Sequence, residues 1–276
     1  MELTGAGAVV TGGASGIGKA TAERLAGEGA RVCVVDIDAE GAEAVAREID
    51  GTSYAADMGE ADEVDAAFAH CNTSFGAVDV AFLNAGIAIG VADLATLTDA
   101  DYRRIMRVNV DGVVYGLRAA IRAMTSNGGG AIVATASLAG LIPFPPDPVY
   151  DLTKHAVVGL IRSAAPALAA QGITANCVNP GMTDTNIIGE DAKQALAAAE
   201  FPLMPAAQIA DAVVHAVMSD ETGRCYVCQP GRDPLPYEFR DVPGPRTANA
   251  EGRIPPGIRD GSRLFRAPET PGRPPG

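Results

Sequence analysis

The sequence predicts an α/β domain with a doubly wound, mostly parallel β-sheet. Two observations predict this fold class: short apolar runs alternate with segments of helical spacing, and a glycine cluster separates the first run from the first helix. Strands that alternate with helices form βαβ units with right-handed crossovers. The strand-like runs are apolar throughout, which is typical of strands covered by helices on both faces.

The expected elements follow one another in a regular order. Strand-like runs lie near residues 6–11, 31–36, 52–56, 78–83, 131–136, 173–179 and 224–229. Helix-like segments lie near residues 16–28, 39–49, 60–75, 101–125, 149–171 and 206–219. We therefore expect one catalytic domain over residues 1–229. Residues 230–276 hold 11 of the 19 prolines and predict an extended or disordered Pro/Arg-rich tail, because proline interrupts helices and central strands.

Composition limits the classes of function. The chain has 276 residues, 47% of them hydrophobic, and a formal net charge of −13. That surface charge disfavours nucleic acid as a partner. We find neither a signal-peptide pattern nor a long apolar run, so we expect a cytoplasmic protein with no membrane partner.

The five cysteines include one C-x-x-C pair, Cys225 and Cys228. This spacing occurs in metal and redox sites, but no second pair of ligands accompanies it. The pair also lies in an apolar run, CYVC, where residues three apart point to opposite faces of a strand. We therefore expect reduced thiols and no metal site.

The glycine cluster predicts a site for a dinucleotide. It follows a strand, opens a helix and begins a βαβ unit, which is the context that this chemistry requires. Glycine permits a tight turn and close approach of a diphosphate to backbone amides at the helix N-terminus. The cofactor-binding candidates here are Gly12, Ser15, Gly16, Ile17 and Gly18.

Asp36 ends the second strand and indicates which dinucleotide binds. A carboxylate there can accept hydrogen bonds from the adenosine ribose and repels the 2′-phosphate of NADP. Ile37 brings no positive charge, and we expect Lys19 to face solvent. We therefore predict NAD, with NADP less favoured. The alternative is that Asp36 only caps the next helix, a role that Asp38 can also fill.

Tyr150 and Lys154 form a candidate acid–base pair. A spacing of four places both side chains on one helix face. A nearby ammonium favours phenolate, so we expect Lys154 to lower the pKa of Tyr150. Ser137 follows a strand and can hold a substrate oxygen, or it is simply a turn residue. Asn109 either holds a relay water near Lys154 or pins its helix as a structural amide.

Taken in order, these motifs resemble the short-chain dehydrogenase/reductase family. The resemblance covers about residues 5–229 and implies a Rossmann-type domain with a seven-stranded sheet. It implies catalysis by Asn109, Ser137, Tyr150 and Lys154, with Lys154 also holding the nicotinamide ribose. It places Asp57 and Met58 at the adenine, and Asn84, Ala85 and Gly86 beside the cofactor in the central sheet. Pro180, Gly181 and Thr183 would contact the nicotinamide. Homodimers or homotetramers are expected through residues 101–125 and 149–171.

Substrate-side segments are expected at residues 138–149 and 182–205. Their apolar side chains favour a lipophilic secondary alcohol or ketone over a sugar phosphate. The predicted function is therefore an NAD-dependent alcohol dehydrogenase or ketoreductase. The alternatives are a catalytically inactive nucleotide-sensing protein and a scaffold that uses the tail as its interaction arm.

Overall fold

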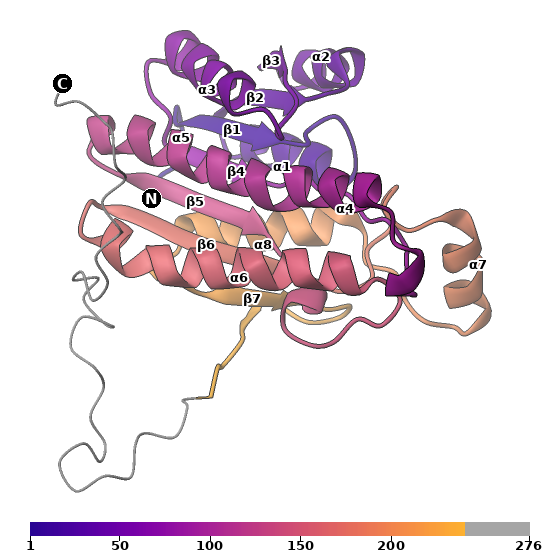
Figure 1. Ribbon diagram of the computed structural model, residues 1–276. Helices are drawn as coiled ribbons and strands as arrows, with labels where there is room; N and C mark the ends of the chain where they lie inside the picture. The colour runs from indigo at the N-terminus through magenta and orange to yellow at the C-terminus, as the bar shows by residue number, and fades with distance from the viewer. Residues whose placement is uncertain (241–276) are drawn as a thin grey trace, which may run out of the picture. The chain divides into compact units, whose positions relative to one another are not determined.

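The computed structural model describes residues 1–240 and confirms the α/β fold class. A single sheet has the strand order β3-β2-β1-β4-β5-β6-β7-β8 (Figure 1). Its strands are β1 (Gly7–Thr11), β2 (Arg31–Asp36), β3 (Thr52–Ala55), β4 (Val80–Leu83), β5 (Gly130–Thr135), β6 (Ile173–Pro180), β7 (Cys225–Cys228) and β8 (Leu235–Pro236). The pairs from β3 through β7 are parallel, and β8 is antiparallel to β7.

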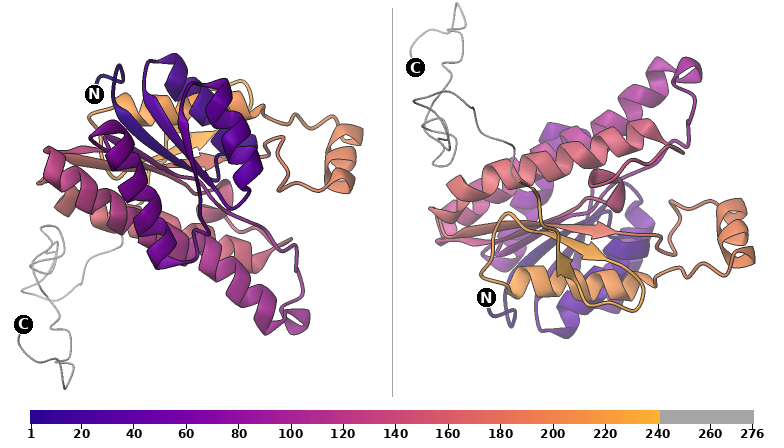
Figure 2. Two further views of the ribbon diagram at one scale, coloured as in Figure 1. Left: turned by 90° about the horizontal axis from the view of Figure 1, so that it is seen from above. Right: turned by 90° about the horizontal axis from the view of Figure 1, so that it is seen from below.

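The helices cover both faces of the sheet. They are α1 (Gly16–Gly27), α2 (Ala39–Glu48), α3 (Ala61–Phe75), α4 (Asp99–Met106), α5 (Gly112–Asn127), α6 (Pro148–Ala169), α7 (Glu190–Ala198) and α8 (Ala206–Met218). Helices α3, α5 and α6 pack on one face, and α1, α2 and α8 pack on the other (Figure 2). Within the described residues, none of the helices combines the length and apolar character that a membrane crossing requires.

Strands β1, β2, β4, β5, β6 and β7 each contribute side chains to both layers of the core. On β1, Val9 belongs to the cluster under α3, α5 and α6, whereas Val10 belongs to the cluster under α1 and α8. The alternation follows from the two-residue period of a strand. It also separates Cys225 and Cys228, which lie in opposite core clusters.

Two predictions about the C-terminal part need correction. The sheet has eight strands and not seven, because the chain after β7 turns back to form β8. The compact unit reaches Tyr237, so the predicted boundary at residue 229 falls inside it. The predicted order of residues 241–276 lies outside the described residues.

Two helical segments also differ from expectation. The segment predicted over residues 101–125 is α4, a π-helical turn η2 (Arg107–Asp111) and then α5. A π-turn inserts one residue into the helical repeat and often marks a functional site. Helix α7 lies within the predicted substrate-side segment and stands away from the sheet (Figure 2).

Candidate active site

The glycine-rich turn joins β1 to α1 at the carboxyl edge of the sheet. Gly12 and Gly16 adopt positive φ angles of 63° and 53°, a region that favours glycine. A Cβ on Gly18 would overlap the carbonyl oxygen of Gly12, so the turn packs tightly against the helix. Ser15 occupies the N-cap position without a side-chain capping bond. The first amides of α1 therefore face the turn in the arrangement that binds a diphosphate.

Asp36 is tied to this turn. Its carboxylate accepts hydrogen bonds from the backbone N–H groups of Ala14, at 3.0 Å, and Asp38, at 3.0 Å. Asp38 itself caps α2 by accepting from the N–H of Gly41 at 3.1 Å. Asp38 is thus the residue that caps α2. Asp36 is bonded to the glycine-rich turn, and the residue that follows it, Ile37, is exposed.

Asn84 links three neighbouring strand ends. Its Nδ2 donates to the carbonyl oxygens of Thr11 and Gly12, each at 3.2 Å, and its Oδ1 accepts from Thr135 Oγ1 at 3.0 Å. Thr11 Oγ1 in turn accepts from the backbone N–H of Asn84 at 2.9 Å. These bonds hold β1, β4 and β5 together at the edge that carries the candidate site.

Asp57 and Met58, the two residues expected at the adenine, have contacts within the protein. Asp57 Oδ2 pairs with Arg107 Nη2 at 2.8 Å, and its Oδ1 accepts from the N–H of Gly59 at 2.8 Å. Met58 is 6% exposed and belongs to the apolar core. Arg107, from η2, also pairs with Glu60 at 2.8 Å. Sequence reasoning missed Arg107, because its partners lie about 50 positions away in the chain.

Tyr150 and Lys154 lie on one face of α6, as their spacing predicts. Lys154 Nζ lies 5.5 Å from the centroid of the Tyr150 ring and donates to the carbonyl oxygen of Thr135 at 2.9 Å. Burial lowers the pKa of Lys154 to about 8. The ammonium form still predominates at neutral pH.

The pKa of Tyr150 moves opposite to the expected direction. Burial raises it most strongly, a hydrogen bond with Ser137 lowers it in part, and the negative charge of Asp147 raises it further. Lys154 Nζ lies 5.5 Å from the ring centroid, and the net shift of the phenol pKa is nevertheless upward. The spacing to Lys154 predicts a lowered phenol pKa, but the net shift from the protein groups is upward, because desolvation outweighs the opposing contribution.

Asn109 is fully buried in η2 and is engaged with protein. Its Oδ1 accepts from the N–H of Ile87 at 2.8 Å, and its Nδ2 donates to Ile87 O at 2.8 Å and Thr153 Oγ1 at 3.1 Å. These bonds join η2, the loop after β4, and α6. The geometry favours the structural reading of this side chain, which pins the helix beside Gly86 and Lys154.

Asp147 is a site residue that the sequence reading missed. It is 2% exposed and caps α6 by accepting from the N–H of Tyr150 at 2.9 Å. Its other oxygen accepts from the N–H groups of Ile89, at 2.9 Å, and Gly90, at 2.7 Å. One buried carboxylate therefore fixes the loop after β4 against the turn of helix that carries Tyr150. A D-P pair before an apolar helix was the available signal.

We expect Asp147→Asn to lower the free energy of unfolding by about 2–3 kcal/mol, because the amide has one acceptor oxygen and cannot accept from both the helix N–H and the two loop N–H groups. Chemical unfolding measured by circular dichroism checks this value. The control is Asp93→Asn, an exposed cap that accepts from Ala95 N–H, where we expect less than about 1 kcal/mol. Equal losses for the two variants would contradict the clamping role of Asp147.

The segment after β6 passes close to the glycine-rich turn. Gly181 continues from Pro180 and donates its N–H to Cys228 O at 3.0 Å, and Thr183 Oγ1 donates to Gly181 O at 3.0 Å. A Cβ on Gly16 would lie 3.4 Å from Thr185 Cγ2. This segment therefore borders the same edge as Ser137, whose Oγ lies 3.5 Å from the carbonyl oxygen of Pro180.

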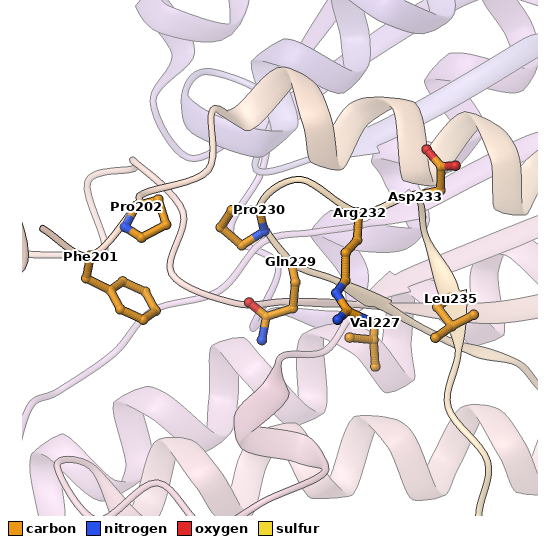
Figure 3. A pocket seen from close by; sticks show the side chains of 8 residues that line it. All are labelled: Phe201, Pro202, Val227, Gln229, Pro230, Arg232, Asp233 and Leu235. Atoms are coloured by element: carbon orange, nitrogen blue, oxygen red, sulfur yellow. The ribbon is translucent and has the colours of Figure 1, made fainter.

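A cavity of about 510 Å³ opens at the end of β7 (Figure 3). Phe201 and Pro202, in the second predicted substrate-side segment, form part of its wall. The remaining lining residues come from the end of β7 and the chain after it: Val227, Gln229, Pro230, Arg232, Asp233 and Leu235. Most of the lining thus lies around and beyond residue 229, where the sequence reading placed the start of the tail.

Comparison with known proteins identifies the family. A sequence profile described as short chain dehydrogenase matches residues 6–196. The chain is a short-chain dehydrogenase. Cyclohexanol dehydrogenase of an Acinetobacter species is 40% identical over 188 residues, which cover 66% of this chain and 75% of the relative. Levodione reductase of Leifsonia aquatica is 34% identical over 193 residues, covering 67% and 72%.

Two further comparisons extend this result. The 3beta-hydroxysteroid dehydrogenase 2 of Eggerthella lenta is 37% identical over 193 residues, covering 67% of this chain and 74% of the relative. A crystal structure of a short-chain type dehydrogenase/reductase from Mycobacterium marinum superposes with a TM-score of 0.78 at 30% identity, covering 83% of this chain and 96% of that one. This short-chain dehydrogenase is thus an oxidoreductase of CH–OH groups whose family uses NAD(H) or NADP(H).

The residues at the carboxyl edge fit such a nucleotide. A side chain at Gly12 or Gly18 would fill the space beside the turn with a Cβ, against Ala85 or Gly12 respectively. The absent side chains let the turn pack closely against Ala85 and the start of α1, which keeps its backbone at the edge where a diphosphate would bind.

Proposed function

We propose that this short-chain dehydrogenase uses NAD to interconvert a lipophilic secondary alcohol and its ketone, with Tyr150 as the acid–base group. The observation that carries the proposal is the convergence of Ser137, Tyr150 and Lys154 at the carboxyl edge of the sheet, beside the glycine-rich turn. An inactive nucleotide sensor has no need of that convergence. The names of the relatives, which include cyclohexanol and hydroxysteroid dehydrogenases, support an apolar ring alcohol.

Each residue has a separate part in the reaction. When bound, oxidised nicotinamide supplies a hydride acceptor and a positive charge that opposes the raised pKa of the phenol. Ser137 Oγ holds the substrate oxygen, and Tyr150 takes the alcohol proton in oxidation or returns it in reduction. Lys154, anchored on Thr135 O, would hold the nicotinamide ribose. Asn109 and Asp147 position the segments that carry these groups.

NAD preference is proposed from the surroundings of Asp36. A 2′-phosphate at this strand end would meet a carboxylate. Lys19, the basic residue nearest in the first helix, is already paired with Glu48 at 2.7 Å and Glu23 at 3.6 Å. If the adenosine ribose binds at Asp36, its next neighbour is Ile37, an uncharged side chain that is 72% exposed.

The proposal is tested by fluorescence titration with NADH and NADPH together with a panel of cyclic ketones and polar polyols. We expect wild-type protein to bind NADH at least about tenfold more tightly, and Asp36→Asn to lose that ratio because the repelling charge is gone. Asp38→Asn, which keeps a good helix cap, is the matched control. A wild-type preference for NADPH, or turnover of polyols alone, would overturn the corresponding part of the proposal.

We also propose a cytoplasmic homodimer or homotetramer. Apolar side chains remain exposed on the helices expected to form the interface: Tyr102 at 43%, Val114 at 39% and Leu152 at 50%. They lie on α4, α5 and α6. Burial of such side chains against a second copy would remove apolar surface from water.

A further inference from the structure

The cavity at the end of β7 has a fixed outer wall. Gln229, Pro230, Gly231 and Arg232 form a turn in which Gly231 has φ 70° and the N–H of Arg232 donates to Gln229 O at 3.3 Å. Proline followed by a glycine of positive φ is the sequence of a type II turn. Gln208 Nε2, from α8, donates to Gln229 O at 2.9 Å and to Arg232 O at 3.3 Å.

The chain beyond the turn is anchored as well. Strand β8 pairs with β7 through Val227 and Leu235, and the N–H of Tyr237 donates to Cys225 O at 2.8 Å. Arg232 therefore projects from a segment held on one side by α8 and on the other by the sheet. Its backbone position is set by tertiary contacts, although this stretch of sequence is rich in proline.

The inner end of the cavity adjoins the candidate catalytic edge. A Cβ on Gly181 would lie 2.7 Å from Gln229 Oε1 and 3.3 Å from Leu138 Cδ1. Leu138 directly follows Ser137. The wall of the cavity and the segment after Ser137 therefore meet at Gly181, so a substrate whose oxygen is held by Ser137 lies next to this cavity.

The cavity contains one cation without a paired carboxylate. Among residues 1–240, no acidic oxygen lies within 4.0 Å of the Arg232 guanidinium. Asp233 is its neighbour in sequence, but Figure 3 shows the two side chains pointing in opposite directions. By contrast, Arg224, at the other end of β7, pairs with Glu221 at 2.6 Å.

The rest of the lining is mainly apolar. Besides Arg232, the lining has the amide of Gln229, the carboxylate of Asp233 and five apolar side chains: Phe201, Pro202, Val227, Pro230 and Leu235. A largely apolar wall with a guanidinium that pairs with no carboxylate of residues 1–240 matches a hydrocarbon body that ends in a carboxylate, because arginine binds that group through two parallel hydrogen bonds. The net charge of −13 repels anions in general, so any preference for an acid must come from a local group.

We propose that the cavity at the end of β7 binds a carboxylate of the substrate through Arg232. The substrate is then a hydroxy acid or keto acid with an apolar body, whose carboxylate lies remote from the carbon that exchanges hydride. This inference rests on the proposed function for the identity of the reacting group, but the carboxylate site itself can be tested by binding alone.

The binding test uses two ligands that cannot react, cyclohexanecarboxylate and cyclohexanecarboxamide, titrated calorimetrically into the protein with NADH. We expect wild-type protein to bind the carboxylate about fivefold more tightly than the amide, a difference within the range of an exposed ion pair. We expect Arg232→Gln to abolish the preference for the carboxylate and Arg232→Lys to keep part of it. Arg224→Gln should leave the preference unchanged. Equal binding of the two ligands, or an unchanged ratio in Arg232→Gln, would overturn the inference.

Turnover separates this inference from the proposed function. Hydroxycyclohexanecarboxylates and their methyl esters are compared as substrates of the same variants. A carboxylate-binding preference without turnover of either series supports the cavity assignment and refutes the proposed function. Equal turnover of acids and esters with no binding preference supports the proposed function and refutes the cavity assignment.

Discussion

Replacing Tyr150 with phenylalanine should lower kcat for alcohol oxidation by about a thousandfold while leaving NAD affinity within about threefold of wild type. The phenol oxygen is the group that exchanges the substrate proton, and positioned acid–base groups contribute about 10²–10⁴ in rate. Phenylalanine keeps the ring above Lys154 and the edge contact with Phe144, whose centroid lies 6.2 Å away. Steady-state kinetics and NADH titration measure the two quantities.

The matched control is Tyr102→Phe, which removes a phenol oxygen from the partly exposed face of α4. We expect this variant to keep wild-type kcat. Retention of more than about a tenth of kcat in Tyr150→Phe would mean that another group moves the proton. Loss of folded structure in Tyr150→Phe, seen as a lowered unfolding midpoint, would instead assign the residue a structural role.

The parallel part of the sheet was predictable because each strand has a distinctive local pattern. The run RVCVVD predicted a strand at 31–36, and β2 spans Arg31–Asp36. Strands buried on both faces are apolar without alternation, and the helices between them show a 3.6-residue period. The glycines of the first turn and the Y-x-x-x-K spacing are likewise local signals. These two local signals are enough to predict where the candidate site lies.

Long-range partners explain what the sequence could not reveal. Asp147 contacts a loop almost sixty positions earlier, at Ile89 and Gly90. Desolvation of Tyr150 depends on segments that close over it, so the direction of its pKa shift could not follow from the spacing to Lys154. Helix α7 buries none of its residues, so an apolar periodicity was not available to predict it.

The predicted domain boundary at residue 229 was wrong for a different physical reason. Pro236 lies in β8, an edge strand, where proline is tolerated because one side of the strand needs no donor. The density of prolines after residue 229 was therefore compatible with an ordered edge. The Q-P-G-R turn was a local signal for that outcome, since proline followed by glycine predicts a reversal of the chain.

Replacing Gly18 with alanine should weaken NAD binding by about a hundredfold and lower the free energy of unfolding by about 1–3 kcal/mol. The added Cβ would overlap Gly12 O and approach Asn84 Nδ2 to 2.9 Å, so the turn must move away from α1. That movement withdraws the amides proposed to bind the diphosphate. NADH titration and chemical unfolding measure the two effects.

Gly27→Ala is the matched control, because a Cβ at this position of the same helix meets no atom within 4 Å. We expect it to preserve NAD affinity and to leave stability unchanged or slightly raised, since alanine favours helix over glycine. If Gly18→Ala bound NAD as well as Gly27→Ala, close packing of the turn would be irrelevant to the cofactor. The nucleotide would then have to lie elsewhere, and Asp36, which accepts from Ala14 N–H in the same turn, would lose its proposed role with it.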